Sequence, residues 1–260
     1  MRYWLAVWTL WQREVVRFLR QRSRVISTLT QPLLFWVLLG AGLHTSFRLP
    51  GAPRDMGYLE YLYPGIMALV LLFTAIFSTI SIVEDRREGF LQGVLVAPVP
   101  RSSIVLGQAL GGATLALGQG ALFLIFAPLV GIPLGPASLL ASIGSMALAA
   151  LQMTGLGLII AWRMESTQGF HAIMNLILMP LWLLSGAFFP AAGAATWLGW
   201  VMRLNPLTYA MALMRRCLYL DNPGALAQLP PLLPSLALTC LFCLAILAAA
   251  AVTACRHRAV

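Results

Sequence analysis

The chain has 260 residues, of which 60% are hydrophobic and 10% charged, and its formal net charge at pH 7 is +9. These proportions exclude an ordinary soluble globular domain, in which about a quarter of the residues are charged. The sequence contains no lysine. A P-loop is therefore excluded as well, because that motif needs a lysine to reach the nucleotide phosphates.

Residues 1–24 begin the chain with an amphipathic pattern. At ~100° per residue, aromatic side chains share one sector and arginines the opposite one. The two sectors hold Trp4, Trp8, Trp11 and Phe18 on one side and Arg13, Arg17 and Arg20 on the other. The pattern predicts an interfacial helix, with its tryptophans at headgroup depth and its arginines against lipid phosphates or a cytoplasmic partner. A lipid anchor without a partner explains it equally well.

Residues 25–260 are dominated by long apolar runs, and a helix needs roughly 20 apolar residues to cross the hydrocarbon core. Cutting the sequence at its charges and at its glycine and proline breaks predicts six spans. They cover residues 25–43, 61–83, 104–130, 137–162, 167–189 and 234–255. Residues 131–136 break one charge-free stretch into the third and fourth spans. Since lipid tolerates no unpaired backbone, we expect an all-α, polytopic bundle.

The segment from about 84 to 98 joins the second and third spans and combines charges with an apolar ridge. Acids in the first turn suit a helix dipole, and the prolines at 98 and 100 would stop the helix. The ridge consists of Phe90, Leu91, Val94 and Leu95, which repeat at helical spacing. Such a ridge suits a groove on a partner. A turn that rests on the membrane surface is the alternative interpretation.

The segment from about 190 to 221 follows the fifth span and is also apolar. Its stretch 195–204 is too short to cross, and Asn205-Pro206 indicates a turn and a new helix start. A pair of short re-entrant helices outside the membrane is expected. Arg203, Arg215 and Arg216 are expected to anchor them at the outer headgroups, with an anionic substrate as the alternative. Cys240 and Cys243 lie within the sixth span without a nearby histidine or acid, so no metal site is expected.

The arginines predict the orientation, because basic residues near span ends stay in the cytoplasm. With the N-terminus inside, twelve of the 17 arginines fall on the cytoplasmic side. We therefore expect a multi-pass protein with both termini in the cytoplasm. Topology accounts for the positive charge better than nucleic-acid binding does, and no nucleic-acid partner is expected.

Three motifs, in this order, resemble the membrane subunits of type-2 ABC exporters, a family that includes drug, polysaccharide and nodulation-factor export permeases. The motifs are the charged turn into G-F-L and L-V-A-P-V-P-R at 84–101, L-S-G-A-F-F-P at 184–190, and N-P-L-T-Y at 205–209 with an arginine downstream. The resemblance covers nearly the whole chain. It implies a six-helix subunit that forms a homodimer and binds two cytoplasmic ATPase subunits. ATP and Mg²⁺ would then be bound by the partner, and this chain would need no cofactor of its own.

The resemblance also implies site residues. Residues 84–98 resemble the family's coupling helix and residues 1–24 its connecting helix. The ATPase-coupling candidates are Glu84, Arg87, Glu88, Phe90, Leu91 and Leu95, and the connecting-helix candidates are Arg13, Arg17 and Arg20. Spans two and five of the family line the substrate route, which makes Thr74, Ser78 and Asn175 candidates for that route. Pairing between helices is the alternative explanation for each of these three polar groups.

The function implied is that of a bacterial inner-membrane permease subunit. It would export an amphipathic, lipid-linked or saccharide-type substrate by alternating access, driven by a separate ATPase. An ion-coupled secondary transporter or channel is the alternative class. Such carriers usually place acids, lysines or several histidines within their spans, whereas the predicted spans here contain only His171. No nucleophile–base pair or carboxylate pair indicates an enzyme.

Overall fold

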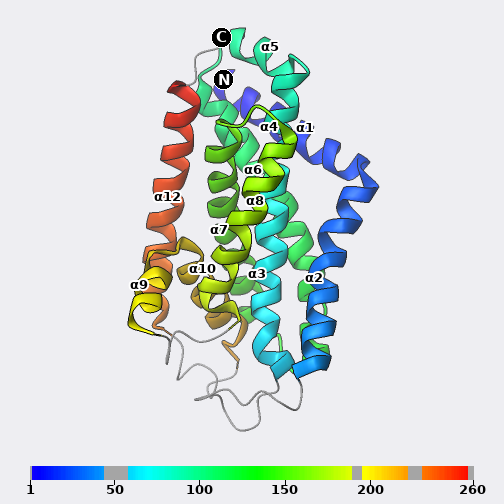
Figure 1. Ribbon diagram of the computed structural model, residues 1–260, viewed down its shortest axis with the longest axis vertical. Coiled ribbons are helices and arrows are strands. Elements are labelled where there is room, and N and C mark those ends of the chain that lie inside the picture. Colours follow the sequence, from blue (N-terminus) through cyan, green and yellow to red (C-terminus); the bar gives the residue numbers. More distant parts are fainter. Residues whose placement is uncertain (1, 44–57, 189–194, 222–229, 257–260) are drawn as a thin grey trace.

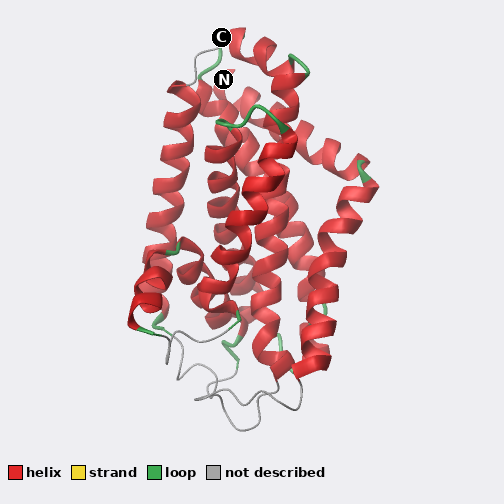
Figure 2. Ribbon diagram, viewed as in Figure 1, coloured by secondary structure: helices red, strands yellow, loops and turns green. Residues whose placement is uncertain are grey.

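The computed structural model describes residues 2–43, 58–188, 195–221 and 230–256, and every regular element among them is a helix (Figures 1 and 2). The long helices run roughly side by side along the long axis of the molecule. The first described helix, the short helix α5 and the C-terminal end of the last helix gather at one end of this bundle, uppermost in Figure 1. We refer to it as the α5 end and to the opposite end as the α9 end.

The bundle contains six long helical segments. They are α2 (Arg22–Leu43), α3 (Tyr58–Ser78) continued by α4 (Ile80–Arg87), α6 (Arg101–Leu124), α7 (Pro136–Ala161), α8 (Thr167–Trp182) continued by the π-helical turn η2 (Leu183–Ala187), and α12 (Leu232–Arg256). Short helices complete the described fold: α1 (Arg2–Arg20), α5 (Phe90–Val96), the 3-10 turn η1 (Ala127–Val130), α9 (Thr196–Leu204) and α10 (Pro206–Leu218). The predicted all-α class is confirmed.

Four segments of the described chain are long and apolar enough to cross a membrane. They are residues Leu59–Arg87, Pro136–Ala161, Thr167–Ala187 and Leu232–Arg256, and they match four of the predicted spans. Helices α2 and α6 occupy the positions of the other two spans. They have the length to cross, at 22 and 24 residues, but contain more polar and small residues.

Helix α3 is the centre of the bundle, and α2, α6, α7, α8 and α10 all pack against it. It is apolar on all sides, as expected of a helix that other helices surround completely. Its polar contacts hold the neighbours in place: Trp182 Nε1 donates to the Gly65 carbonyl at 2.7 Å, and Tyr63 Oη donates to the Phe123 carbonyl at 2.6 Å. A Cβ atom at Gly65 would lie 2.7 Å from the carbonyl oxygen of Ala187, so only glycine lets η2 approach this closely.

Two breaks that the sequence predicts are present. The hairpin between α6 and α7 turns at Gly131, whose φ of +83° favours glycine, and α7 begins at Pro136. The second break separates α9 from α10 at Asn205, whose side chain accepts from the Leu207 N–H at 2.9 Å and donates to the Leu181 carbonyl at 2.7 Å. Residues 189–194, where the predicted external segment begins, lie outside the described residues.

Candidate functional site

The α5 end brings together three helices, α1, α4 and α5. Helix α4 continues α3 beyond the packed bundle and carries Glu84 and Asp85 in its last turn. Gly89 then adopts a φ of +78°, which only glycine takes without strain, and α5 begins at Phe90. The prediction of one helix over 84–98 with acids in its first turn is therefore wrong: the acids end α4, and Gly89 separates them from the short α5. Helix α4 continues past Glu84 and Asp85 because Gly89, and not a charged residue, marks its end.

Helix α1 lies against α6 through two glycines on α6. A Cβ atom at Gly107 would lie 2.9 Å from Leu10 Cβ, and one at Gly111 would lie 2.8 Å from Glu14 Cβ. The buried face of α1 holds Val7, Leu10, Glu14 and Phe18. Among the predicted tryptophan sector, Trp4 and Trp8 stay exposed, while Trp11 Nε1 donates to Thr114 Oγ1 at 3.0 Å. Only part of the tryptophan sector therefore contacts the rest of the protein.

Two arginines of α1 converge on the acids of α4. Arg13 donates to both carboxylate oxygens of Asp85, at 2.6 and 2.5 Å. Arg17 donates to Asp85 Oδ1 at 2.8 Å and to Glu84 Oε2 at 2.7 Å. Because the Asp85 side chain is only 2% exposed, these charge-assisted bonds are shielded from water. The hydrogen bonds that Arg13 donates to Asp85 also raise the pKa of Arg13 above its usual range.

These contacts correct one expectation about α1. Arg13 and Arg17 face carboxylates of their own chain, because α1 packs with this side against α4, instead of facing lipid phosphates or a partner. Arg20, in the last turn of α1, is exposed. The helix α1 ends at Arg20 and α2 begins at Arg22, so the interfacial helix is shorter than the predicted 1–24.

Glu14 is a member of this cluster that the sequence did not single out. Its side chain is among the buried polar groups, with 4% of the residue exposed, and it accepts a hydrogen bond from Gln108 Nε2 at 3.2 Å. Burial raises its pKa above the usual range of a glutamate. The one available signal was that Glu14 is the only acid in a helix whose other charges are arginines.

The ATPase-coupling candidates separate into two groups. Arg87 and Glu88 are exposed, and Phe90 is 41% exposed, with the Arg13 guanidinium 3.8 Å from its ring centroid. Leu91 is buried at 5% exposure, so it faces its own chain and not outward as the spacing predicted. Leu95 is half-buried against the core, and Glu84 is held by Arg17.

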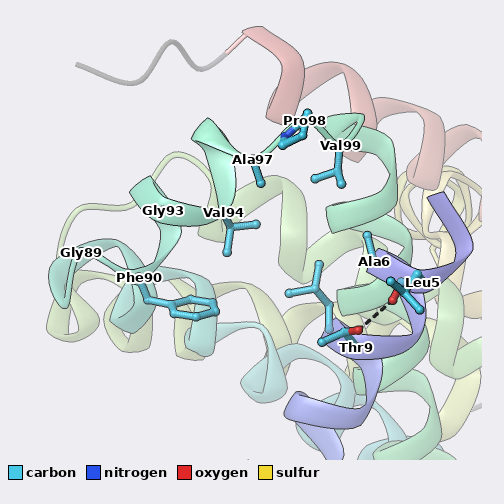
Figure 3. A pocket seen from close by; sticks show the side chains of 11 residues that line it. Leu5, Ala6, Thr9, Gly89, Phe90, Gly93, Val94, Ala97, Pro98 and Val99 are labelled. Carbon is cyan, nitrogen blue, oxygen red and sulfur yellow. Dashed lines mark hydrogen bonds between the residues drawn. The ribbon is translucent and has the colours of Figure 1, made fainter. Parts of the chain in front are cut away.

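A groove of about 530 Å³ lies between α1 and α5 (Figure 3). Side chains of α1 line one side and those of α5 and the following loop line the other. The lining residues are Leu5, Ala6, Thr9, Leu10, Gly89, Phe90, Gly93, Val94, Ala97, Pro98 and Val99. The groove is almost entirely apolar, so it suits apolar side chains and not a charged ligand.

The three candidates for a substrate route differ in their burial and in their hydrogen-bond partners. Thr74 is buried and donates to Gln119 Oε1 of α6, and Ser78 is buried and donates to the carbonyl of Ala75 in its own helix at 2.7 Å. Asn175 is exposed on α8. Thr74 makes the pairing between helices that was the alternative explanation. In the described parts of the chain, no group of three or more potential metal-ligating side chains is present.

The sequence profile of the ABC-2 type transporter family matches residues 5–219, which include every element of this site. The chain belongs to this family. It is 29% identical to the transport permease ycf38 of Cyanophora paradoxa, over 80% of this chain and 72% of the relative. It is 28% identical to nodulation protein J of Rhizobium leguminosarum bv. trifolii, over 82% and 79%. It is 23% identical to the inner membrane transport permease YadH of Escherichia coli, over 81% of each.

Family membership confirms the resemblance drawn from the three motifs and identifies a membrane transport permease. Two of the motifs have clear structural roles. The charged turn supplies the acids that hold α1 and the glycine that starts α5. Asn205-Pro206 ends α9 and caps α10.

Proposed function

We propose that this ABC-2 type permease is the membrane subunit of an ATP-driven exporter. Six spans cross the membrane, both termini are cytoplasmic, and two copies pair with two ATPase subunits that bind ATP and Mg²⁺. The substrate is amphipathic, lipid-linked or saccharide-type, and it leaves the cytoplasm or the inner leaflet by alternating access. The name of the YadH relative and the excess of arginine at the α5 end support a bacterial inner membrane as the location.

The observation that carries this proposal is the construction of the α5 end. Arg87, Glu88 and Phe90 are exposed at the tip of a segment whose base is held by Arg13 and Arg17. Buried, bidentate ion pairs resist separation, because parting them leaves a charge without water or a partner. A force applied at α5 would therefore move α1, α4 and α5 together.

The same force would reach the centre of the bundle. Helix α4 follows α3 with only Thr79 between them, and α3 contacts five other helices. Displacement of the exposed tip by an ATPase would shift α3 against its neighbours. Coupling of this kind requires one element that touches the ATPase and also belongs to the transport core. In our proposal this element is α3–α4–α5, whose tip is exposed and whose other end is packed in the bundle.

Asn175 remains our candidate for the substrate route, together with Thr74 and Ser78, which are buried on α3. Asn175 and His171 are both exposed on α8, in a segment apolar enough to cross the membrane. Polar side chains that face hydrocarbon are costly, so this face of α8 is better suited to a second copy of the chain or to a polar path between the copies.

The coupling proposal is tested by co-purification of the permease with the ATPase subunit that the proposal requires. Truncation of a contact residue at a protein interface commonly costs more than ~1 kcal/mol, so Phe90→Ala is expected to weaken association about fivefold or more. Glu88→Arg is expected to act in the same direction by reversing an exposed charge at the tip. Thr196→Ala, an exposed change on α9 at the other end of the bundle, is the control.

Equal co-purification and equal substrate-stimulated hydrolysis for all three variants would contradict the assignment of this tip as the coupling element. The same preparation without the ATPase separates the two classes of transporter. An exporter subunit alone should neither hydrolyse ATP nor move solute along a proton or sodium gradient. Robust gradient-driven flux by the chain alone would instead favour a secondary transporter.

A further inference from the structure

A second cavity lies at the α5 end, away from the groove described above. It has a volume of about 320 Å³ and lies between the last turns of α7 and α12. Its lining combines two arginines, one hydroxyl and two apolar side chains: Arg163, Arg256, Thr253, Ala249 and Val252. Among the described residues, no carboxylate lines the cavity.

The two arginines of this cavity differ from the others at the same end. Arg13 and Arg17 bond to carboxylates, and Arg86 donates to the carbonyls of Met164 and Trp162 at 2.9 Å each. In contrast, neither the Arg163 side chain nor the Arg256 side chain makes a hydrogen bond or an ion pair with any described residue, and both residues are exposed. Their positive charge is not neutralised within the described chain.

A third arginine adds to the positive charge beside the cavity. Arg101, at the start of α6, donates to the carbonyls of Ala254 and Cys255 at 3.2 and 2.9 Å, in the last turn of α12. These two carbonyls therefore already have a donor, and Arg256 is not needed to bond them. Three arginines therefore lie near one another at this site, and the side chains of Arg163 and Arg256 have no acidic partner among the described residues.

Apolar surface continues from the cavity along α12. Leu241, Leu244 and Val252 are exposed large side chains of this helix, and both α7 and α12 are long and apolar enough to cross a bilayer. A ligand with a negative head and long apolar chains therefore matches both the cavity and the surface beside it. Basic pockets between the ends of transmembrane helices bind anionic lipid headgroups in this way.

We propose that the cavity between α7 and α12 binds the phosphate of an anionic phospholipid, whose acyl chains lie along the exposed face of α12. Guanidinium groups present paired donors that match phosphate oxygens, and two of them line this cavity, Arg163 from the turn after α7 and Arg256 from the end of α12. The oxygen of Thr253, whose hydroxyl donates to the Ala249 carbonyl at 2.8 Å, is free to accept from a headgroup hydroxyl. The lipid would join the ends of α7 and α12.

The experiment measures lipid retention by native mass spectrometry, after the purified full chain is equilibrated with equimolar phosphatidylglycerol and phosphatidylethanolamine. Wild-type protein is expected to retain phosphatidylglycerol preferentially. Removal of one arginine, Arg163→Ala or Arg256→Ala, should weaken that binding about fivefold, and removal of both about 25-fold, at ~1 kcal/mol for each basic side chain. The double variant Arg163→Lys with Arg256→Lys should bind less tightly than the wild type and more tightly than the double alanine variant, because it keeps the charge and loses the paired guanidinium donors.

The control is Arg203→Ala, which removes one exposed arginine from α9 at the opposite end of the bundle. Equal loss in the control, or full retention in the double alanine variant, would overturn the site. Displacement of the lipid by inorganic phosphate alone would show a site for a free anion and would overturn the lipid assignment. The measurement uses no ATPase and no transported substrate, so its result is independent of the exporter proposal.

Discussion

Asp85 is the residue on which the α5 end depends most. Its buried carboxylate accepts three hydrogen bonds from Arg13 and Arg17, and it lies in the last turn of α4, where an acid is unfavourable to the helix dipole. The two guanidinium groups offset that cost and fix α1 in place. Neither arginine suggests this partner in the sequence, because more than 60 positions separate each from the acids.

Glu14 gives a pH prediction at the same site. Burial raises its pKa above the ordinary 4.5, so the folded protein keeps this proton to a higher pH than the unfolded chain does. Protonated Glu14 therefore adds to the free energy of unfolding. This contribution is complete below pH 4.5 and is lost as the pH rises through the raised pKa of Glu14. Glu14→Gln, which keeps the shape and cannot ionise, should remove this loss. At neutral pH its melting temperature in detergent should equal or exceed that of the wild type.

The control for this titration is Glu165→Gln, because Glu165 is an exposed acid at the same end of the bundle. It should leave the pH dependence of the melting temperature unchanged. A Glu14→Gln variant whose melting temperature falls with pH as steeply as that of the wild type would show that Glu14 does not remain protonated beyond its ordinary range.

At the scale of helices, α6 provides both a contact and its own control. Gly111 lies against α1, where a Cβ atom would be 2.8 Å from Glu14 Cβ, whereas Gly118 on the same helix has nothing within 4 Å. Gly111→Ala should destabilise the fold by about 1–3 kcal/mol through overpacking. Gly118→Ala should be neutral or stabilising by up to about 1 kcal/mol, since alanine favours a helix. Thermal unfolding of both variants measures the difference.

A second measurement locates the effect of Gly111→Ala. If the added methyl group displaces α1, association with the ATPase should weaken as well, because α1 lines the groove beside α5. Two glycine variants that unfold at the same temperature would show that α1 does not need the close approach to α6 that the structure contains.

The sequence predicted those helical elements that depend on local signals. Apolar length located the long helices, Gly131 and Pro136 located the hairpin, and Asn205 located the start of α10. The sequence did not predict which face of α1 meets the protein. Both the tryptophan sector and the Leu10 face are apolar, and only the glycines of α6 decide between them.

The candidate site was predicted in part for the same reason. Spacing located the exposed Phe90, but it could not assign Leu91 to the interior, because neighbouring positions on so short a helix share an apolar pattern. The groove between α1 and α5 depends on two segments more than 80 residues apart, and no local pattern reports such a contact. The missing information is the packing of one helix on another.

For the whole molecule, the distribution of charge predicts an orientation across the membrane. Eight arginines with described side chains lie at the α5 end: Arg13, Arg17, Arg20, Arg86, Arg87, Arg101, Arg163 and Arg256. Three others lie on the short helices α9 and α10, which follow α8 in the chain: Arg203, Arg215 and Arg216. Because basic residues are retained in the cytoplasm, the α5 end should be cytoplasmic.

Reporters inserted in the full chain test this orientation. An insertion after Gly89, between α4 and α5, should be cytoplasmic. Insertions at Gly131 and at Asp221 should both be outside, because the hairpin that begins at Gly131 lies beside Asp221, whose carboxylate accepts from the Gly135 N–H at 2.8 Å. That contact and the hydrogen bond with Ser138, the larger influence, lower the pKa of Asp221, so it should stay ionised at the outer surface.

Reporter activity and the accessibility of each insertion to an impermeant reagent measure the side. The prediction has two parts that fail separately. If Gly131 and Asp221 were on different sides, the fold itself would be contradicted, since their segments are joined by a hydrogen bond. Gly89 lies at the α5 end of the bundle and Asp221 at the α9 end. If both were on the same side of the membrane, α3 and α7, which run from one end to the other, could not cross it. A reversed but consistent pattern would keep the bundle and place Phe90 outside, where no ATP-binding partner could reach it.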